Sequence, residues 1–145
     1  MSRGFLGTRA GLPADINLVV QVAMLVVLIY AVIQAKRGKA SHCQIMPVLV
    51  IINAALIIAV MNPAFFRALP AAVQNPTRPR PSVMWPHALL GGIAQLLGVY
   101  ISIASQNLEF REAHLPTLKR LMRITAVLWS AALINGILLY FVWYM

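Results

Sequence analysis

Four long runs of apolar residues fill most of this chain and decide the solvent in which it folds. Two of them, Ile16 to Ala35 and Ile124 to Met145, reach the roughly 20 residues that a helix needs to cross a hydrocarbon core. The other two, Ile45 to Met61 and Ala88 to Ala104, lie near the lower limit, and their flanks extend them. Because no water at the membrane centre can bond the backbone, we expect all four runs to be helices.

The composition agrees with this class of protein. Hydrophobic residues make up 61% of the chain and charged residues 10%, whereas a soluble domain carries about 25% charged residues. The sequence predicts an all-α protein, one membrane domain over 1–145 that forms an integral four-helix up-and-down bundle. We expect no enzyme, because the loops leave no room for a catalytic domain. The spans are expected at about 16–36, 43–62, 86–105 and 120–144, with a proline-rich loop over 63–85.

The net charge of +9 predicts contact with the lipid bilayer rather than with nucleic acid. The basic residues lie between the spans, where they meet anionic headgroups. No stretch interleaves basic with aromatic residues as a nucleic-acid platform does.

The distribution of Lys and Arg predicts the orientation. The first and third connections carry seven of these residues, and the N-terminal tail with the second connection carries five. The positive-inside rule then places the first and third connections in the cytoplasm. We therefore expect a multi-pass protein of the bacterial inner (cytoplasmic) membrane with both termini in the periplasm.

The second connection is rich in proline. Proline lacks an N–H and fixes φ, so the segment from Asn75 to Pro86 is predicted to be extended rather than helical. The more apolar segment 63–73 predicts a short interfacial helix. The connection serves either as a linker with aromatic anchors or as a stiff docking segment for a larger partner.

Few polar residues are candidates for a site inside the membrane. The only acids are Asp15, Glu109 and Glu112, and we expect all three outside the spans, which disfavours a pump or a channel. Asn53 in the second run and Asn135 in the fourth are expected to bond neighbouring helices.

Two faces of small residues predict close helix packing. A stripe in the third run also leaves room for a flat macrocycle below a histidine, which is the alternative interpretation. The stripe contains Gly91, Ala94, Gly98, Ser102 and Ser105, and the face expected to receive it contains Thr125, Trp129, Ala132, Gly136 and Tyr140.

Three histidines and one methionine are the candidate cofactor residues. His42 opens the second run and His87 opens the third, so they lie at opposite membrane faces and cannot ligate one iron. His42 and Met46 share a helix face, and His114 lies on the same side of the membrane as His42. Imidazole and thioether groups are ligands for haem iron or copper. The alternative is that these histidines bond headgroups or loop carbonyls.

The pattern His42-x-x-x-Met46 after a basic loop, His87 at the head of the third run, His114, and the closing LKRLMRITAVLWSAALINGILLYFVWY resemble the CtaM/YozB-like family. This small bacterial membrane family is a domain of unknown function, and the similarity covers about 16–145. The resemblance implies a four-helix membrane protein linked to haem-copper oxidase assembly, with His42, Met46, His87 and His114 as the residues to carry over. The chain departs from the family in its proline-rich second loop.

Two function classes follow. The first is a non-catalytic accessory or assembly subunit of a membrane electron-transfer complex, either a respiratory oxidase or a photosynthetic complex, with that larger membrane complex as its partner. The second is a small haem- or copper-binding membrane electron carrier.

Overall fold

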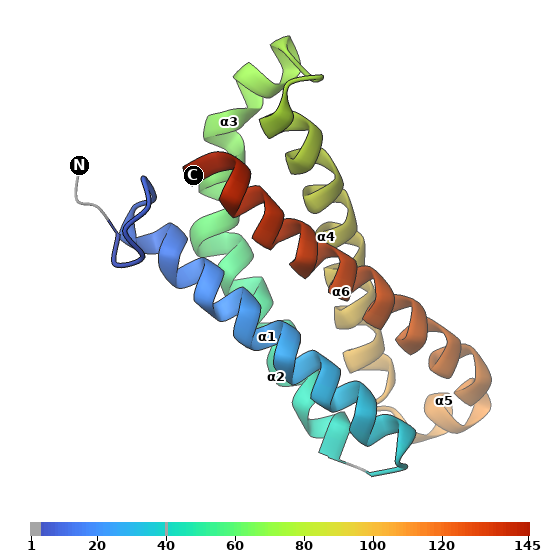
Figure 1. Cartoon of the computed structure of the whole chain (residues 1–145). Helices are drawn as coiled ribbons and strands as arrows, with labels where there is room; N and C mark the ends of the chain where they lie inside the picture. The colour runs from blue at the N-terminus through green and yellow to red at the C-terminus, as the bar shows by residue number, and fades with distance from the viewer. Residues whose placement is uncertain (1–3, 40) are drawn as a thin grey trace.

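The structure is a computed structural model that describes residues 4–39 and 41–145, and all regular elements among them are helices (Figure 1). Four helical runs are long and apolar enough to cross a membrane, which confirms the predicted all-α membrane bundle. The elements are α1 (Leu12–Lys36), α2 (Ser41–Leu56), the π-helix η1 (Ile57–Met61), α3 (Asn62–Gln74), α4 (Pro79–Ala104), α5 (Leu108–Ala113) and α6 (Leu115–Tyr144).

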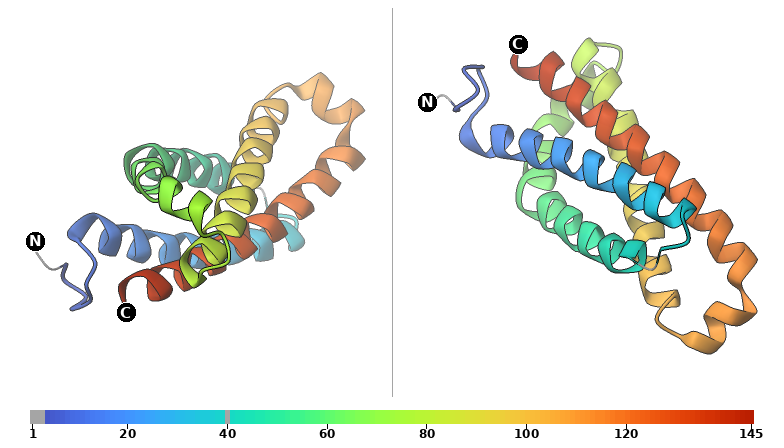
Figure 2. Two further views of the ribbon diagram at one scale, coloured as in Figure 1. Left: turned by 90° about the horizontal axis from the view of Figure 1, so that it is seen from above. Right: turned by 60° about the horizontal axis from the view of Figure 1, so that its bottom comes forward.

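The helices follow one another up and down around a closed ring. Contacts join α1 to α2, α2 to α4, α4 to α6 and α6 back to α1, and the largest interface joins α4 to α6. Both termini lie at one end of the bundle, and α5 and the α1–α2 connection lie at the other (Figures 1 and 2). The bundle is therefore held mainly by the α4–α6 pair.

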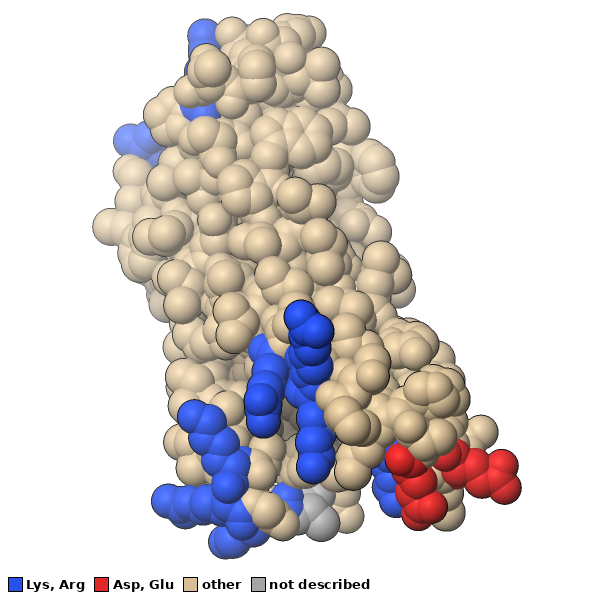
Figure 3. Space-filling view, turned by 90° about the vertical axis from the view of Figure 1, so that its right-hand side faces the viewer, with Lys and Arg blue, Asp and Glu red and all other residues tan. Residues whose placement is uncertain are grey.

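The core lies where the four long helices meet. It is built from Met24 and Leu28 of α1, Leu49 and Val50 of α2, Ala94 of α4, and Trp129 and Leu133 of α6. Large apolar side chains such as Val26, Ile51, Leu96 and Val127 point outward instead, as a lipid-facing surface allows. Figure 3 shows a long uncharged band between Lys and Arg residues near the two ends, most of them at the lower one.

Small residues set the distance between α4 and its neighbours. Ala94 and Gly98 are buried, and the whole α6 face predicted to receive the stripe is buried as well. A Cβ on Gly98 would stand 3.0 Å from Val50 Cγ2. The stripe therefore brings α2 close to α4, in addition to packing against α6.

The predicted proline-rich loop over 63–85 is wrong. Only Asn75–Arg78 separates α3 from α4. Pro79 and Pro81 lie in the first turn of α4, where a backbone N–H has no helical partner to lose. The segment 63–73 is helical, but it continues the second helical run through η1 instead of forming a separate helix.

Two local signals fix the ends of the helices. Gly38 adopts a φ of 68° after α1, and Lys39 N donates to Gln34 O at 3.1 Å, which closes a Schellman turn. Asn107 caps α5 by accepting a hydrogen bond from Phe110 N at 3.0 Å. Pro116 lies in the first turn of α6, where its missing N–H breaks no helical hydrogen bond.

Replacing Gly98 with Leu tests the close packing. We expect the G98L variant to lose about 1–3 kcal/mol of unfolding free energy, because the added side chain overpacks the contact with Val50. Thermal unfolding in one detergent measures the loss. Gly92→Leu is the control, since a Cβ at Gly92 meets no atom within 4 Å. Equal loss in both variants would contradict the packing account.

Candidate functional site

A cavity of about 350 Å³ lies between α1, α2, η1, α3, α4 and α6. The π-helix η1 forms part of its wall with Ile57, Val60 and Met61. π-Helical turns inside longer helices occur frequently at functional sites. The polar residues that line the cavity are Asn17, Gln21, Asn53, Asn62, His87, Tyr140 and Tyr144.

His87 presents one ring nitrogen with no partner in the described chain. It lies in the third turn of α4 and does not open that helix, which corrects the prediction, because α4 already begins at Pro79. Its Nδ1 lies 3.0 Å from Ala132 O. A carbonyl oxygen only accepts, so Nδ1 carries the proton and Nε2 remains an acceptor in the neutral ring. The same arrangement fixes the ring of many ligand-binding histidines.

Gln21 is the most unusual side chain of the cavity wall. It is 3% exposed, and its Oε1 is buried without a hydrogen-bond partner among the described residues. The Oδ1 atom of Asn17, one turn earlier on α1, is also buried without a hydrogen-bond partner among the described residues. An unpaired buried amide carbonyl is unfavourable for folding. The two oxygens therefore suit a molecule that donates hydrogen bonds.

Because Gly136 has no side chain, the side chains of Gln21 and His87 can approach the backbone of α6. A Cβ at this position would stand 2.7 Å from His87 Cε1 and closer still to Gln21 Oε1. Side chains from α1 and α4 therefore converge on one glycine of a third helix. Sequence reasoning placed Gly136 on a packing face but missed Gln21, although an amide inside an apolar run is the signal that singled out Asn53.

Asn53 makes the interhelical hydrogen bond predicted for it. Its Nδ2 donates to Gln95 Oε1 at 2.8 Å, and Gln95 Nε2 donates to Val50 O at 3.1 Å. These bonds join α2 to α4 beside the cavity. Asn135 is also predicted to bond a neighbouring helix. Its Oδ1 atom is instead buried without a hydrogen-bond partner in the described part of the chain.

Asp15 corrects the prediction that all three acids lie outside the spans. It lies in the first turns of α1 and has no exposed surface. Its Oδ1 accepts from the Tyr140 hydroxyl at 2.5 Å, and its Oδ2 accepts from Leu6 N at 2.9 Å. The Thr8 hydroxyl lies 2.7 Å from that of Tyr140. This satisfied network ties the N-terminal segment to the end of α6.

The other predicted site residues lie apart from the cavity. His42 Nδ1 is 2.8 Å from Lys39 O, and Met46 packs against the buried core. His114 stacks on Phe110 with ring centroids 4.2 Å apart. Within residues 4–39 and 41–145, no group of three or more His, Cys, Asp or Glu side chains is placed to hold a metal ion.

The four candidate cofactor residues are not gathered at this cavity. Of the four, only His87 lines the cavity. Comparisons with family models, with curated proteins and with solved structures found no match to this chain.

Substituting two glutamines distinguishes an amide that bonds a neighbouring helix from an amide whose oxygen has no partner. We expect Gln95→Leu to lower the unfolding free energy by about 0.6–1.7 kcal/mol, because it leaves Asn53 unpaired inside the membrane. Gln21→Leu is expected to leave stability unchanged or to raise it, because the substitution removes an unsatisfied carbonyl. Unfolding of both variants in the same detergent measures the difference. A larger loss for Gln21→Leu than for Gln95→Leu would show that Gln21 has a partner.

Proposed function

We propose that this protein is a non-catalytic accessory or assembly subunit of a membrane electron-transfer complex, a respiratory oxidase or a photosynthetic complex. One observation carries the proposal: the buried, unpaired Gln21 shares a cavity with His87 inside a lipid-exposed bundle. Polar groups inside a membrane bundle are unfavourable for folding, so one that also lines a cavity is a candidate for ligand binding. The resemblance to the CtaM/YozB-like family agrees with such a role.

In this proposal the cavity holds a lipid-soluble molecule that donates hydrogen bonds, and the headgroup of a quinol has that chemistry. Gln21 Oε1 accepts from one ligand hydroxyl, and either Asn17 Oδ1 or His87 Nε2 accepts from the other. Trp129, Phe65 and other apolar side chains of the wall pack against the ring. Such pockets combine mainly apolar walls with a few placed polar groups.

The proposal includes the location. The protein is multi-pass, and we assign it to the bacterial inner membrane with both termini in the periplasm. The support is that seven Lys and Arg residues lie in or next to the α1–α2 and α4–α6 connections, against five on the other side.

The second candidate function is the small haem or copper carrier. The observation that favours it is His87, whose ring is oriented by Ala132 O and faces a cavity with Gly91 and Gly136 in its wall. The separation of His42, Met46 and His114 from that cavity leaves His87 as the one member of the four predicted ligands in its wall, which weakens this candidate.

Gentle detergent extraction distinguishes the two functions. We expect the protein to co-purify with the chains of an oxidase or a reaction centre, because an accessory subunit is held by its neighbours. Mass spectrometry identifies these chains, and the absorption spectrum of the dissociated protein is recorded afterwards. A protein that purifies alone, with a Soret band that is lost in H87A, would contradict the subunit role and support the carrier.

Binding of a short-chain quinol analogue tests the cavity. We expect Gln21→Leu to weaken binding about tenfold, because one lost hydrogen bond in a dry site costs about 1.4 kcal/mol. Gln34→Leu is the matched control, since Gln34 is also buried on α1 with an unpaired Oε1 in the described chain but lies outside the cavity. Quenching of tryptophan fluorescence follows the titration. Equal binding by both variants would remove Gln21 from the site.

A further inference from the structure

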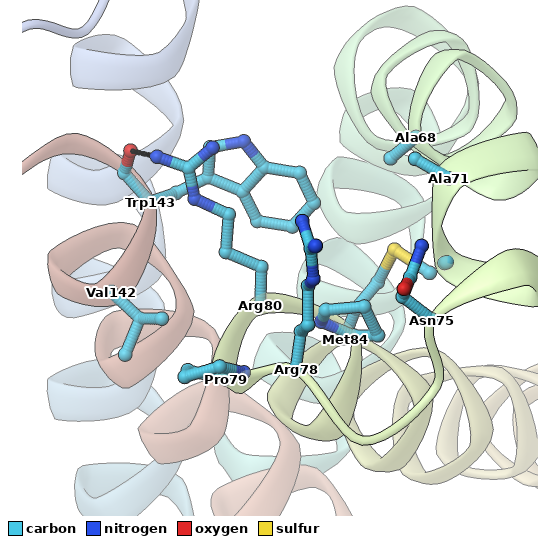
Figure 4. A pocket seen from close by; sticks show the side chains of 11 residues that line it. Ala68, Ala71, Asn75, Arg78, Pro79, Arg80, Met84, Val142 and Trp143 are labelled. Atoms are coloured by element: carbon cyan, nitrogen blue, oxygen red, sulfur yellow. Dashed lines mark hydrogen bonds between the residues drawn. The ribbon is translucent and has the colours of Figure 1, made fainter.

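A second hollow lies at the end of the bundle that carries both termini. It has a volume of about 490 Å³ and lies between α3, the start of α4 and the end of α6. Figure 4 shows the side chains of Arg78 and Arg80 rising from the start of α4 into the space between Trp143 on one side and Ala68 and Ala71 on the other. The hollow therefore combines positive charge with an apolar wall.

The two arginines keep most of their hydrogen-bonding capacity. Arg80 donates to Trp143 O at 3.4 Å, and its guanidinium carbon lies 6.0 Å from the centroid of the Trp143 ring. This contact holds Arg80 in place and occupies one of its five N–H donors. Arg78 makes no side-chain hydrogen bond to the described residues, and its exposed side chain lines the hollow (Figure 4).

No Asp or Glu side chain neutralises this pair among the described residues. The chain has three acids. The carboxylate of Asp15 accepts hydrogen bonds from Tyr140 and Leu6. Glu109 and Glu112 belong to α5, at the opposite end of the bundle (Figures 1 and 3). The hollow thus holds two unpaired positive charges.

We propose that this hollow binds an anionic phospholipid, with its phosphodiester between Arg78 and Arg80 and an acyl chain against the wall that Ala68 and Ala71 of α3 form. Guanidinium groups bind phosphate oxygens with two parallel N–H bonds. Trp85 and Trp143 lie at this end of the bundle, and tryptophan is enriched at headgroup depth. The apolar wall favours a lipid over a free phosphate ion. This hollow adjoins the first cavity, with which it shares Met84 and Trp143, but the lipid proposal does not depend on the proposed function.

Thermal unfolding of the full chain in neutral detergent, with phosphatidylglycerol or phosphatidylcholine added to the micelles, tests the proposal. We expect phosphatidylglycerol, and not phosphatidylcholine, to raise the Tm of the native protein. In the double variant Arg78→Gln/Arg80→Gln the concentration of phosphatidylglycerol needed for half of the rise should increase about tenfold. The control Lys119→Gln/Arg120→Gln loses the same charge on exposed positions of α6 and should respond like the native protein.

Two further measurements distinguish lipid binding from other causes of a rise in Tm. Ala71→Trp keeps both arginines and fills the apolar wall, so it should weaken the response to phosphatidylglycerol. Inorganic phosphate should give no rise in Tm at the same concentration. An equal response in the two charge variants would overturn the proposal in favour of a general surface-charge effect, and a full response to inorganic phosphate would overturn it in favour of a free anion.

Discussion

The hydrocarbon around the four long helices is the constraint on which the rest of the structure depends. It offers no hydrogen bonds, so each polar side chain inside the bundle is paired within the protein or remains unfavourable. Asn53 and Gln95 pair with each other, and Asp15 is paired through Tyr140. Gln21 is buried without a partner in the described chain and faces the same cavity as His87. Among the described residues, Gln21 and Asn17 are therefore the unpaired buried amides that line this cavity, whereas Gln34 and Asn135 lie outside it.

Packing and cavity arise from the same interface. Small residues let α4 lie close to α6 and α2, as Ala94 and Gly98 do in the core. Further along, Gly136 leaves space that the side chains of Gln21 and His87 occupy. The π-helix η1 continues α2 along the cavity with a wider turn. The close packing at Ala94 and Gly98 thus positions the helices that surround the cavity.

Much of the architecture could be predicted from the sequence, because span length and helical spacing are local properties. The apolar runs gave the membrane class, and the three-and-four spacing gave the buried face of α6. Prolines misled the prediction because their effect depends on where a helix begins, and Pro79 and Pro81 fall in a first turn. The burial of Asp15 depends on the N-terminal segment folding against Tyr140. The cavity beside Gln21 depends on where helices fail to touch, which periodicity does not encode.

Cryo-electron microscopy of the gently extracted protein, in its complex or in a lipid nanodisc, tests the central claim most directly. The account predicts density that belongs to no protein chain between α1, η1 and α6, within hydrogen-bonding distance of Gln21 Oε1 and the His87 ring. A closed cavity, in which Gln21 is bonded to another side chain of the protein, would contradict it.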